Sequence, residues 1–527
     1  MQALSLRPRG VSLREVVPEA TLIGCDDVLV GSICSDAAAV MPGDVFLASL
    51  TADGDTHEDY LKAVRRGAAA VIGERLLPTP IPMAIVPDSR KAYARLCQAV
   101  AGAPSREMPV IGVTGTGGKT CVCELLASVF KLAGYQVGVI DSVRRLPDQW
   151  SGAVGAVADV DQAAAVDAAG NPLPTTPEPP EMARRLAEME ADGVDVAIVE
   201  ISSSALADYR LEGIALDAAV ITNIRREHLD EHGAVANYRQ IKGRILDLLK
   251  PEGFAVMNAD DPSSKHLIGE VSHPLMTVGL RSPAEVTGEI VERRLSEQTF
   301  LLEAGCETAP VRTLMIGEHH ALNCLCAAAV GLVYNIPLGT IVSGLERITS
   351  IPGRLSRVEA GQPFGVFVDE AKTPDALATT LRALRQATRG DVWLVYGCDA
   401  DGPAAIRPAL GRVAEKGARH TIITSDNPRH ERPLELAHQL LDGYDRPHSA
   451  RVMPSRQDAI VWALSQAKPG DSVLIAGKGA ARQQVIDGRR YAFDDVEIAR
   501  AWLAEADFSE SLPEEEPATI RLYHKAA

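Results

Sequence analysis

Short apolar runs alternate with amphipathic stretches along most of the chain. The runs are rich in Val, Ile and Ala, and they include residues 109–115 (PVIGVTG), 195–202 (DVAIVEIS), 218–224 (AAVITNI) and 253–260 (GFAVMNAD). Continuous apolar runs of this length are typical of strands buried on both faces, and the stretches between them are long enough for crossover helices. The pattern therefore predicts an α/β fold built on mostly parallel sheets.

Two stretches interrupt this rhythm and predict domain boundaries. Residues 102–109 (GAPSREMP) carry small residues and two prolines, and residues 350–359 (SIPGRLSRVE) form a second break. The chain is also several times the length of an average domain. We therefore predict three α/β domains followed by an acidic tail, at residues 1–106, 107–350, 351–507 and 508–527.

Four apolar runs beyond the second break each end in polar residues or glycine. They are residues 364–370 (FGVFVDE), 391–399 (DVWLVYGCD), 420–428 (HTIITSDNP) and 471–479 (DSVLIAGKG). In parallel sheets ligands collect at the carboxyl ends of the strands. We expect chemistry at these strand ends.

The composition is that of an ordinary globular protein, and the net charge argues against one class of function, nucleic-acid binding. The chain has 527 residues, of which 46% are hydrophobic, and a formal net charge of -17. So acidic a surface repels a phosphate backbone, which argues against a nucleic-acid partner. The first residues lack an apolar core of signal-peptide length, and no apolar run is long enough for a membrane span. We expect a cytoplasmic protein with no membrane partner.

A glycine-rich turn lies between the first apolar run of the central region and a helical stretch. Its residues are Gly115, Thr116, Gly117, Gly118, Lys119 and Thr120. In a strand–turn–helix setting the backbone N–H groups converge on a phosphate, the lysine reaches the outer phosphates and the threonine hydroxyl can bind Mg²⁺. The longer form of this motif would have glycine where Val113 stands, so the turn is a shorter variant. It predicts nucleotide binding.

Two polar side chains at neighbouring strand ends are candidates for the metal site. Glu200 ends the buried strand predicted at residues 195–200 (DVAIVE), and His228 follows the run 218–224. A carboxylate and an imidazole placed there could complete Mg²⁺ coordination around the γ-phosphate. Each residue alone also has a plain structural interpretation, Glu200 as a helix cap and His228 as a surface histidine.

Eight motifs in order make the function more specific. They are VIGVTGTGGKT, VEISSSAL, TNIRREHLDEHGAVANYRQIKGRILD, NADD, PGRL, TPDAL, TSDNPR and AGKG. In this order the chain resembles the Mur ligase family, and within it the UDP-N-acetylmuramoyl-tripeptide ligases. The resemblance implies an N-terminal UDP-binding domain, a central ATPase and a Rossmann-like C-terminal domain that binds the amino acid. It also implies a monomer that uses ATP and Mg²⁺ to turn the terminal carboxylate of UDP-N-acetylmuramoyl-dipeptide into an acyl phosphate, which an amino acid then attacks.

The resemblance assigns roles to single residues. For catalysis and metal binding it implies Lys119, Thr120, Glu200, His228 and Lys242, the last as a carbamate. By spacing alone Lys242 would be a solvated helix lysine. For the nucleotide the resemblance adds Asn323, Arg354 and Asp369; for the sugar-peptide Thr175, Thr176, Ser202 and Arg210; and for the amino acid Arg407, Asp426, Asn427, Pro428, Arg429 and Gly477. The stretch 426–429 (DNPR) is the signature of members that select meso-diaminopimelate, because an arginine fork can bind the distal carboxylate that lysine lacks.

The chain departs from the family pattern in its binding motifs. Ala481 replaces the glutamate of G-K-G-H-E, Glu370 and Lys372 replace the tyrosine and histidine of D-Y-A-H-T-P, Asp36-Ala37-Ala38 replaces D-S-R, Ser204 a histidine, Asp208 a glutamine, and Gly117 an asparagine. The family's G-G-D-R-D-x-x-K-R reads DADGPAAIR here, which keeps Asp401 and Arg407. Without the glutamate, the distal ammonium of diaminopimelate would lose its partner in the pocket.

Three interpretations stay open at this point. The chain is a working tripeptide ligase with an altered pocket, a divergent paralogue that joins a different amine to a different carboxylate, or a nucleotide-binding pseudoenzyme. Retention of Lys119, Thr120, Glu200, His228 and Lys242 favours catalysis, because nothing structural requires all five. Loss of the uridine and ammonium contacts favours a changed substrate.

Overall fold

The computed structural model describes residues 10–51, 54–142, 175–225, 235–506 and 508. The chain divides into two compact units, Met1–Ile351 and Pro352–Ala527. No helix among the residues described above is long and apolar enough to cross a membrane. The division of the first unit into separate domains at residues 1–106 and 107–350 stays a proposal, and most of the tail predicted at 508–527 lies outside the described residues.

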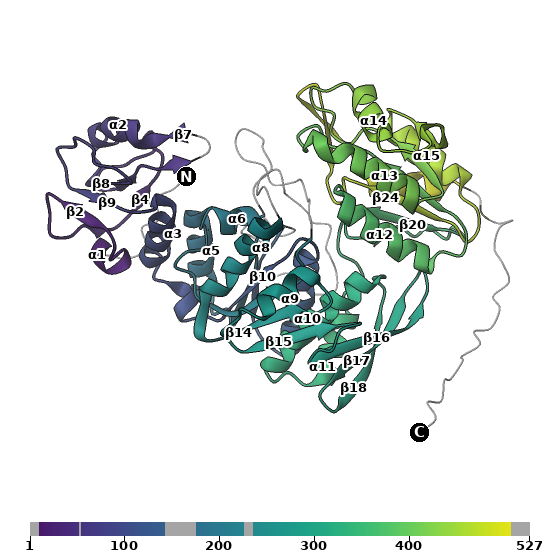
Figure 1. The fold of residues 1–527 in the computed structure, drawn as a ribbon, viewed down its shortest axis with the longest axis horizontal. Coiled ribbons are helices and arrows are strands. Elements are labelled where there is room, and N and C mark those ends of the chain that lie inside the picture. Colours follow the sequence, from purple (N-terminus) through teal and green to yellow (C-terminus); the bar gives the residue numbers. More distant parts are fainter. Residues whose placement is uncertain (1–9, 52–53, 143–174, 226–234, 507, 509–527) are drawn as a thin grey trace. The chain divides into compact units, whose positions relative to one another are not determined.

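The first unit begins with a small five-stranded sheet (Figure 1). Its strands, in spatial order, are β2 (Thr21–Ile23), β9 (Met83–Ile85), β8 (Ala70–Gly73), β5 (Val45–Leu47) and β4 (Ile33–Cys34). All neighbours pair in parallel except β2 and β9. Helix α3 (Ser89–Val100) packs on this sheet through Leu96 and Val100, because its apolar residues recur at helical spacing.

A nine-stranded sheet forms the centre of the first unit (Figure 1). Its order is β11 (Val137–Ile140), β12 (Val196–Glu200), β10 (Val110–Thr114), β13 (Leu216–Ile221), β14 (Leu249–Asn258), β15 (Leu275–Gly279), β16 (Val286–Arg293), β17 (Gln298–Ala304) and β18 (Glu307–Thr313). Neighbours from β11 to β16 pair in parallel, and the last two strands are antiparallel additions. The parallel α/β prediction is confirmed.

Two apolar layers cover the central sheet. Successive residues of β10 point to opposite faces, so Ile111 and Val113 join one core cluster and Val110 the other. Three helices pack on the first face, α4 (Lys119–Leu132), α10 (Glu318–Val333) and α11 (Leu338–Glu346). The second face is covered by α5 (Pro179–Ala191), α6 (Ser203–Ala207) and α8 (Val235–Gly243). Burial on both faces explains why these strands read as unbroken apolar runs.

The second unit is a six-stranded sheet with helices around it. Its order is β19 (Ser356–Arg357), β20 (Gly365–Asp369), β24 (Ser472–Ala476), β21 (Val392–Tyr396), β22 (His420–Ile423) and β23 (Ala450–Val452), with only β19 antiparallel. The helices include α12 (Pro374–Ala387), α13 (Arg407–Gly417), α14 (Pro433–Leu441), α15 (Arg456–Gln466) and α16 (Asp495–Glu505). The carboxyl ends of the four central strands meet at one edge, where the sequence predicts ligands.

Candidate nucleotide and substrate sites

The glycine-rich turn joins β10 to α4 and has a backbone that only glycine adopts easily. Gly115 has φ 153° and Gly118, the residue before the first turn of α4, has φ 85°. A Cβ on Gly115 would lie 1.9 Å from Thr222 Oγ1, and one on Gly118 would lie 2.3 Å from Asn323 Oδ1. A Cβ on Gly117 would meet open space. Two of the three glycines are therefore required by space as well as by backbone angle.

Thr222 and Asn223 hold this turn from the end of β13. Thr222 Oγ1 donates to the carbonyl of Gly117 at 2.6 Å, and Asn223 Nδ2 donates to the same oxygen at 3.0 Å. The backbone N–H of Gly117 donates back to Asn223 Oδ1 at 3.1 Å. These two residues were missed as functional positions in the sequence. Their signal was the polar Thr–Asn pair at the end of an otherwise apolar strand.

Two lysines converge on one backbone oxygen of the turn. Lys119 Nζ donates to the carbonyl of Gly115 at 3.1 Å, and Lys242 Nζ donates to the same carbonyl at 2.9 Å. Lys242 is only 1% exposed, and its ammonium lies 4.9 Å from the centre of the Tyr238 ring. The plain expectation of a solvated helix lysine is thus wrong for Lys242. Two cations beside a phosphate-type turn are suited to neutralising phosphate charge.

Thr120 and Glu200 form the oxygen pair that the sequence predicts at the metal site. Thr120 Oγ1 donates to Glu200 Oε2 at 3.0 Å, and both residues are buried. Ser142, which follows β11, donates its backbone N–H to Glu200 Oε2 at 3.0 Å and lies 3.0 Å from Thr120 Oγ1. Ser142 was not foreseen, although it stands at a strand end like the others.

His228 lies outside the described residues, so its predicted place beside this pair stays a prediction. Within the described part of the chain, His, Cys, Asp and Glu side chains form no cluster of three that could hold a metal. The oxygen pair of Thr120 and Glu200 nevertheless suits Mg²⁺, which prefers hydroxyl and carboxylate oxygens and is bound in proteins by one or two carboxylates.

The residues expected at the sugar-peptide lie beside the same strand end. Thr176 Oγ1 donates to the carbonyl of Glu200 at 2.9 Å and accepts from the backbone N–H of Ser202 at 2.9 Å. Ser202 caps α6 by accepting from the N–H of Ala205 at 3.1 Å. Thr175, half-buried, precedes Thr176. The structure therefore brings three of the four predicted residues to the end of β12.

Arg210 is paired with carboxylates of its own chain. Its guanidinium lies 2.9 Å from Glu178 and 3.0 Å from Asp208, the residue that replaces the family's glutamine. Burial raises the pKa of the Glu178 carboxyl, and the charge of Arg210 opposes this shift. A substrate carboxylate would have to compete with these two groups for Arg210.

The residues expected at the nucleotide belong to both units. Asn323, in α10 of the first unit, lies against Gly118 of the turn. In the second unit Asp369 ends β20 and accepts from the backbone N–H groups of Leu355 at 2.6 Å and Ala371 at 3.0 Å. Burial raises the pKa of Asp369. Arg354 forms an ion pair with Glu370, one of the residues that departs from the family pattern.

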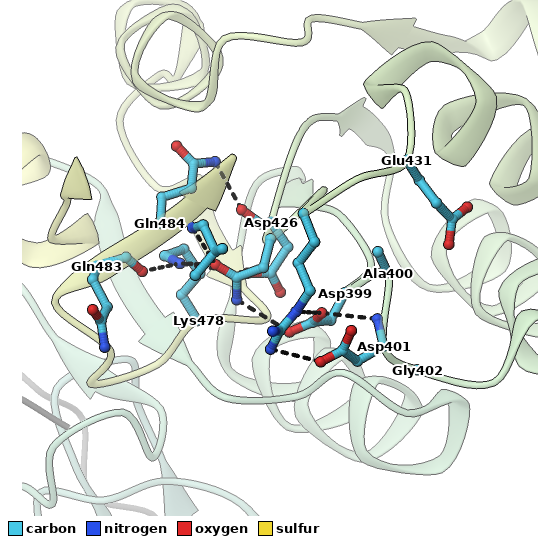
Figure 2. A network of polar contacts seen from close by, with 12 residues as sticks. Asp399, Ala400, Asp401, Gly402, Asp426, Glu431, Lys478, Gln483 and Gln484 are labelled. Atoms are coloured by element: carbon cyan, nitrogen blue, oxygen red, sulfur yellow. Dashed lines mark hydrogen bonds and ion pairs between the residues drawn. The ribbon is translucent and has the colours of Figure 1, made fainter. Parts of the chain in front are cut away.

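Asp426, one of the residues expected at the amino acid, lies in a polar network of the second unit together with Lys478 and Asp399 (Figure 2). Lys478 Nζ, fully buried, lies 3.6 Å from Asp426 and donates to Asn427 Oδ1 at 3.3 Å. A Cβ on Gly477, whose φ is 110°, would lie 2.8 Å from Asp426 Oδ2. The structure thus brings Asp426, Asn427 and Gly477 together, with Pro428 next in the chain. Lys478 was missed in the sequence, where Gly477 and Ala481 were the residues singled out in this stretch.

Arg407 is buried, and both of its terminal nitrogens donate to groups of its own chain. It is 3% exposed, and its two terminal nitrogens each lie 2.9 Å from a carboxylate oxygen of Glu431. One nitrogen also donates to the carbonyl of Ala400 at 3.0 Å. The hydrogen bonds from Arg407 lower the pKa of Glu431. Arg407 therefore ties the 399–407 loop to the 426–431 stretch, which is a positioning role.

Comparisons with known proteins place the chain among ligases. Residues 113–331 match the Mur ligase middle domain, and residues 353–479 match the family described as Mur ligase, glutamate ligase domain. The chain is 35% identical over 479 residues to the UDP-N-acetylmuramoyl-L-alanyl-D-glutamate–2,6-diaminopimelate ligase of Geobacillus thermodenitrificans, which covers 89% of this chain and 94% of that one.

Solved structures of such ligases share the fold. A structure of a UDP-N-acetylmuramoyl-L-alanyl-D-glutamate–2,6-diaminopimelate ligase superposes with a TM-score of 0.65 at 26% identity, covering 94% of this chain and 99% of that one. The MurF ligase of Thermotoga maritima in complex with ADP gives a TM-score of 0.58 at 18% identity, covering 90% and 97% of the two chains. The second likeness shows the shared fold alone.

Proposed function

The chain belongs to the Mur ligase family, and we propose that it is an ATP-dependent ligase that joins an amino acid to UDP-N-acetylmuramoyl-L-alanyl-D-glutamate in peptidoglycan precursor synthesis. The observation that carries this proposal is the phosphate-type turn with Lys119 and Lys242 on one carbonyl oxygen and with Thr120 bonded to Glu200. This arrangement supports the binding of a nucleotide whose γ-phosphoryl group is transferred.

The reaction follows from the poor reactivity of a carboxylate. Transfer of the γ-phosphoryl group of ATP to the terminal carboxylate gives ADP and an acyl phosphate, and attack by the amine then gives an amide and phosphate. Lys119 stabilises the charge that develops on the transferred group, because its ammonium group is already fixed at Gly115. The turn's N–H groups and the start of α4 orient the phosphates.

Mg²⁺ would be held by Thr120 and Glu200, and we propose His228 and a carbamylated Lys242 as further ligands. When bound, the ion neutralises phosphate charge. The buried Lys242 ammonium, 2.9 Å from the Gly115 carbonyl, places the group to be modified at the turn itself. The backbone N–H of Ser142 donates to Glu200 Oε2 at 3.0 Å and so orients this carboxylate.

We propose the ligand contacts that the family resemblance implies for the other residues. Asn323, Arg354 and Asp369 hold the nucleotide, and Thr175, Thr176, Ser202 and Arg210 hold the sugar-peptide. Asp426, Asn427, Pro428, Arg429 and Gly477 form the amino-acid site, and Arg407 positions the stretch that carries them through Glu431. The proximity of Thr176 and Ser202 to the carbonyl of Glu200 supports a carboxylate substrate close to the metal pair. A monomer working in the cytoplasm is part of the same proposal.

The test is ADP release in the presence of ATP, Mg²⁺, UDP-N-acetylmuramoyl-dipeptide and a panel of amino acids. We expect release to require the dipeptide substrate and an amine, and Lys119→Ala to lower it by about 100-fold or more. Lys131→Ala is the matched control, because it removes the same charge from the last turn of the same helix, and it should leave ADP release unchanged. Equal ADP release by Lys119→Ala and the unaltered protein would refute the proposal.

One observation favours a second candidate, a paralogue that acts on a different acid. Arg210 is already paired with Asp208 and Glu178, so a strongly acidic substrate gains less there than in a relative with glutamine in place of Asp208. The same assay with other nucleotide-linked acids decides the matter. If ADP is released only when another nucleotide-linked acid is present, that acid is the substrate in place of the muramoyl dipeptide.

A further inference from the structure

The backbone of Arg429 is held in place by a hairpin of the second unit. Its backbone is left-handed, with φ 50°, and its N–H donates to the carbonyl of Val485 at 3.0 Å. Val485 belongs to β25 (Gln483–Ile486), which forms a hairpin with β26 (Arg489–Ala492). The hairpin therefore holds the backbone of Arg429, and the guanidinium reaches back toward the end of β21.

Two carboxylates meet this guanidinium. Arg429 Nε lies 3.3 Å from Asp399 Oδ1, and its Nη2 lies 2.8 Å from Asp401 Oδ2. Asp399 also accepts from Asn427 Nδ2 at 3.1 Å. The side chain of Asp399 is 23% exposed and that of Asp401 is 63% exposed, so Asp399 is the better shielded partner. Figure 2 shows the two aspartates within the same polar network.

The other cations of the network are matched one to one. Lys478 has Asp426, and Arg407 has Glu431. Around Arg429, by contrast, one positive group faces two negative ones. Asp426 Oδ1 is buried and lies 3.6 Å from Lys478 Nζ, so the charge of this carboxylate is already matched. The strand-end site is thus short of positive charge.

The numbers of positive and negative side chains in this site differ from those expected in a site that binds a diamino dicarboxylic acid such as diaminopimelate. Asp399 stands at the first position of DADGPAAIR, where the family pattern has glycine, and Ala481 stands where that pattern has glutamate. The site has therefore gained a carboxylate beside the arginine and lost one elsewhere. A second substrate carboxylate would have to displace Asp399 from Arg429, whereas a cationic side chain would be attracted by the unmatched negative charge.

We propose that Asp399 is a specificity-determining residue, and that the amine substrate is an amino acid with a cationic side chain and no second carboxylate. Asp399 acts by occupying the Nε edge of Arg429, and Asp401 shares the remaining edge. The inference rests on the proposed function and names the amine class for the same site.

The experiment measures kcat/KM for lysine and for meso-diaminopimelate in the unaltered protein and in Asp399→Asn. We expect lysine to be preferred by about tenfold or more, and Asp399→Asn to shift the ratio toward meso-diaminopimelate by about tenfold. Asparagine keeps an acceptor for Asn427, so the loop should stay in place. Asp391→Asn is the matched control, since Asp391 immediately precedes β21 at the opposite edge of the sheet.

A second variant separates an effect through Arg429 from a general loss of charge. In an Arg429→Met background, Asp399→Asn should change the ratio by less than about twofold, because the two substitutions act on one contact. A preference of the unaltered protein for meso-diaminopimelate that Asp399→Asn does not alter would overturn the inference. Absence of ADP release with every amine would instead contradict the proposed function, so the two failures are distinguishable.

Discussion

Single glycines shape the phosphate-type turn. Gly115 and Gly118 have positive φ, and Thr222 and Asn323 fill the space that a side chain on them would need. Gly117, between them, has an ordinary φ and open space beside its Cα. The family pattern has asparagine at this position, which agrees with the room found there. The three glycines of one turn therefore have different tolerances.

We predict that Gly118→Ala weakens ATP binding by about tenfold or more, since a left-handed alanine costs about 1–2 kcal/mol and its Cβ would push Asn323 away. Gly117→Ala is the matched control and should bind ATP as the unaltered protein does. Calorimetric titration of each variant with ATP measures the two dissociation constants. Equal affinities for the two variants would contradict this account of the turn.

The residue types in the sequence predicted the phosphate-type turn. They could not predict which side chains and backbone groups form hydrogen bonds or ion pairs with one another. The order of Gly, Lys and Thr between a strand and a helix identified Lys119 and Thr120, because that chemistry is local. Lys242 looked solvated because its contact, the carbonyl of Gly115, lies 127 positions away in the chain. The pairing of Arg429 with Asp399 was hidden for the same reason. Side-chain partners between separate elements depend on the fold rather than on local sequence.

The helices α4 and α11 show how closely the elements behind the turn are packed. A Cβ on Gly344 of α11 would lie 2.7 Å from Val129 Cα of α4, so glycine there allows the two backbones to approach. Ser128 Oγ of α4 donates to the carbonyl of Gly344 at 2.6 Å. Because α4 begins at the phosphate-type turn, this contact supports the position of Lys119 and Thr120.

Gly344→Ala should destabilise the first unit by about 1–3 kcal/mol, since the added methyl overpacks the contact with Val129. Gly339→Ala, in the same helix, meets open space and should be neutral or stabilise by up to about 1 kcal/mol through its higher helix propensity. Chemical denaturation of both variants gives the two free energies of unfolding. Destabilisation by Gly339→Ala equal to that by Gly344→Ala would refute the packing argument.

The sequence predicted the positions of several strands along the chain but not their spatial order in the sheet. Apolar runs located β10, β12, β13 and β14, because strands buried on both faces have a local signature. The antiparallel extension β16–β18 was not foreseen. Its residues alternate between buried and exposed, which gives a weaker signal, and the spatial order of strands depends on contacts far apart in the sequence.

In both units, arginines that were expected to bind the substrates or the nucleotide form ion pairs with acidic side chains of the chain itself. Asp208 and Glu178 pair with Arg210, Glu370 with Arg354, and Asp399 with Arg429. The chain carries a net charge of -17, so its surplus of carboxylates reaches into the candidate sites as well as the surface. At the phosphate-type turn, by contrast, the ammonium group of Lys119 donates to the backbone carbonyl of Gly115.

The most direct test of the central claim follows one oxygen atom. If the acid is activated as an acyl phosphate, an oxygen of its carboxylate leaves with the phosphate. The substrate carboxylate is labelled with oxygen-18, turnover is run with ATP, Mg²⁺ and the amine, and the phosphate is read by ³¹P NMR. The account predicts one labelled oxygen in each phosphate released. Unlabelled phosphate accompanying amide formation would contradict it.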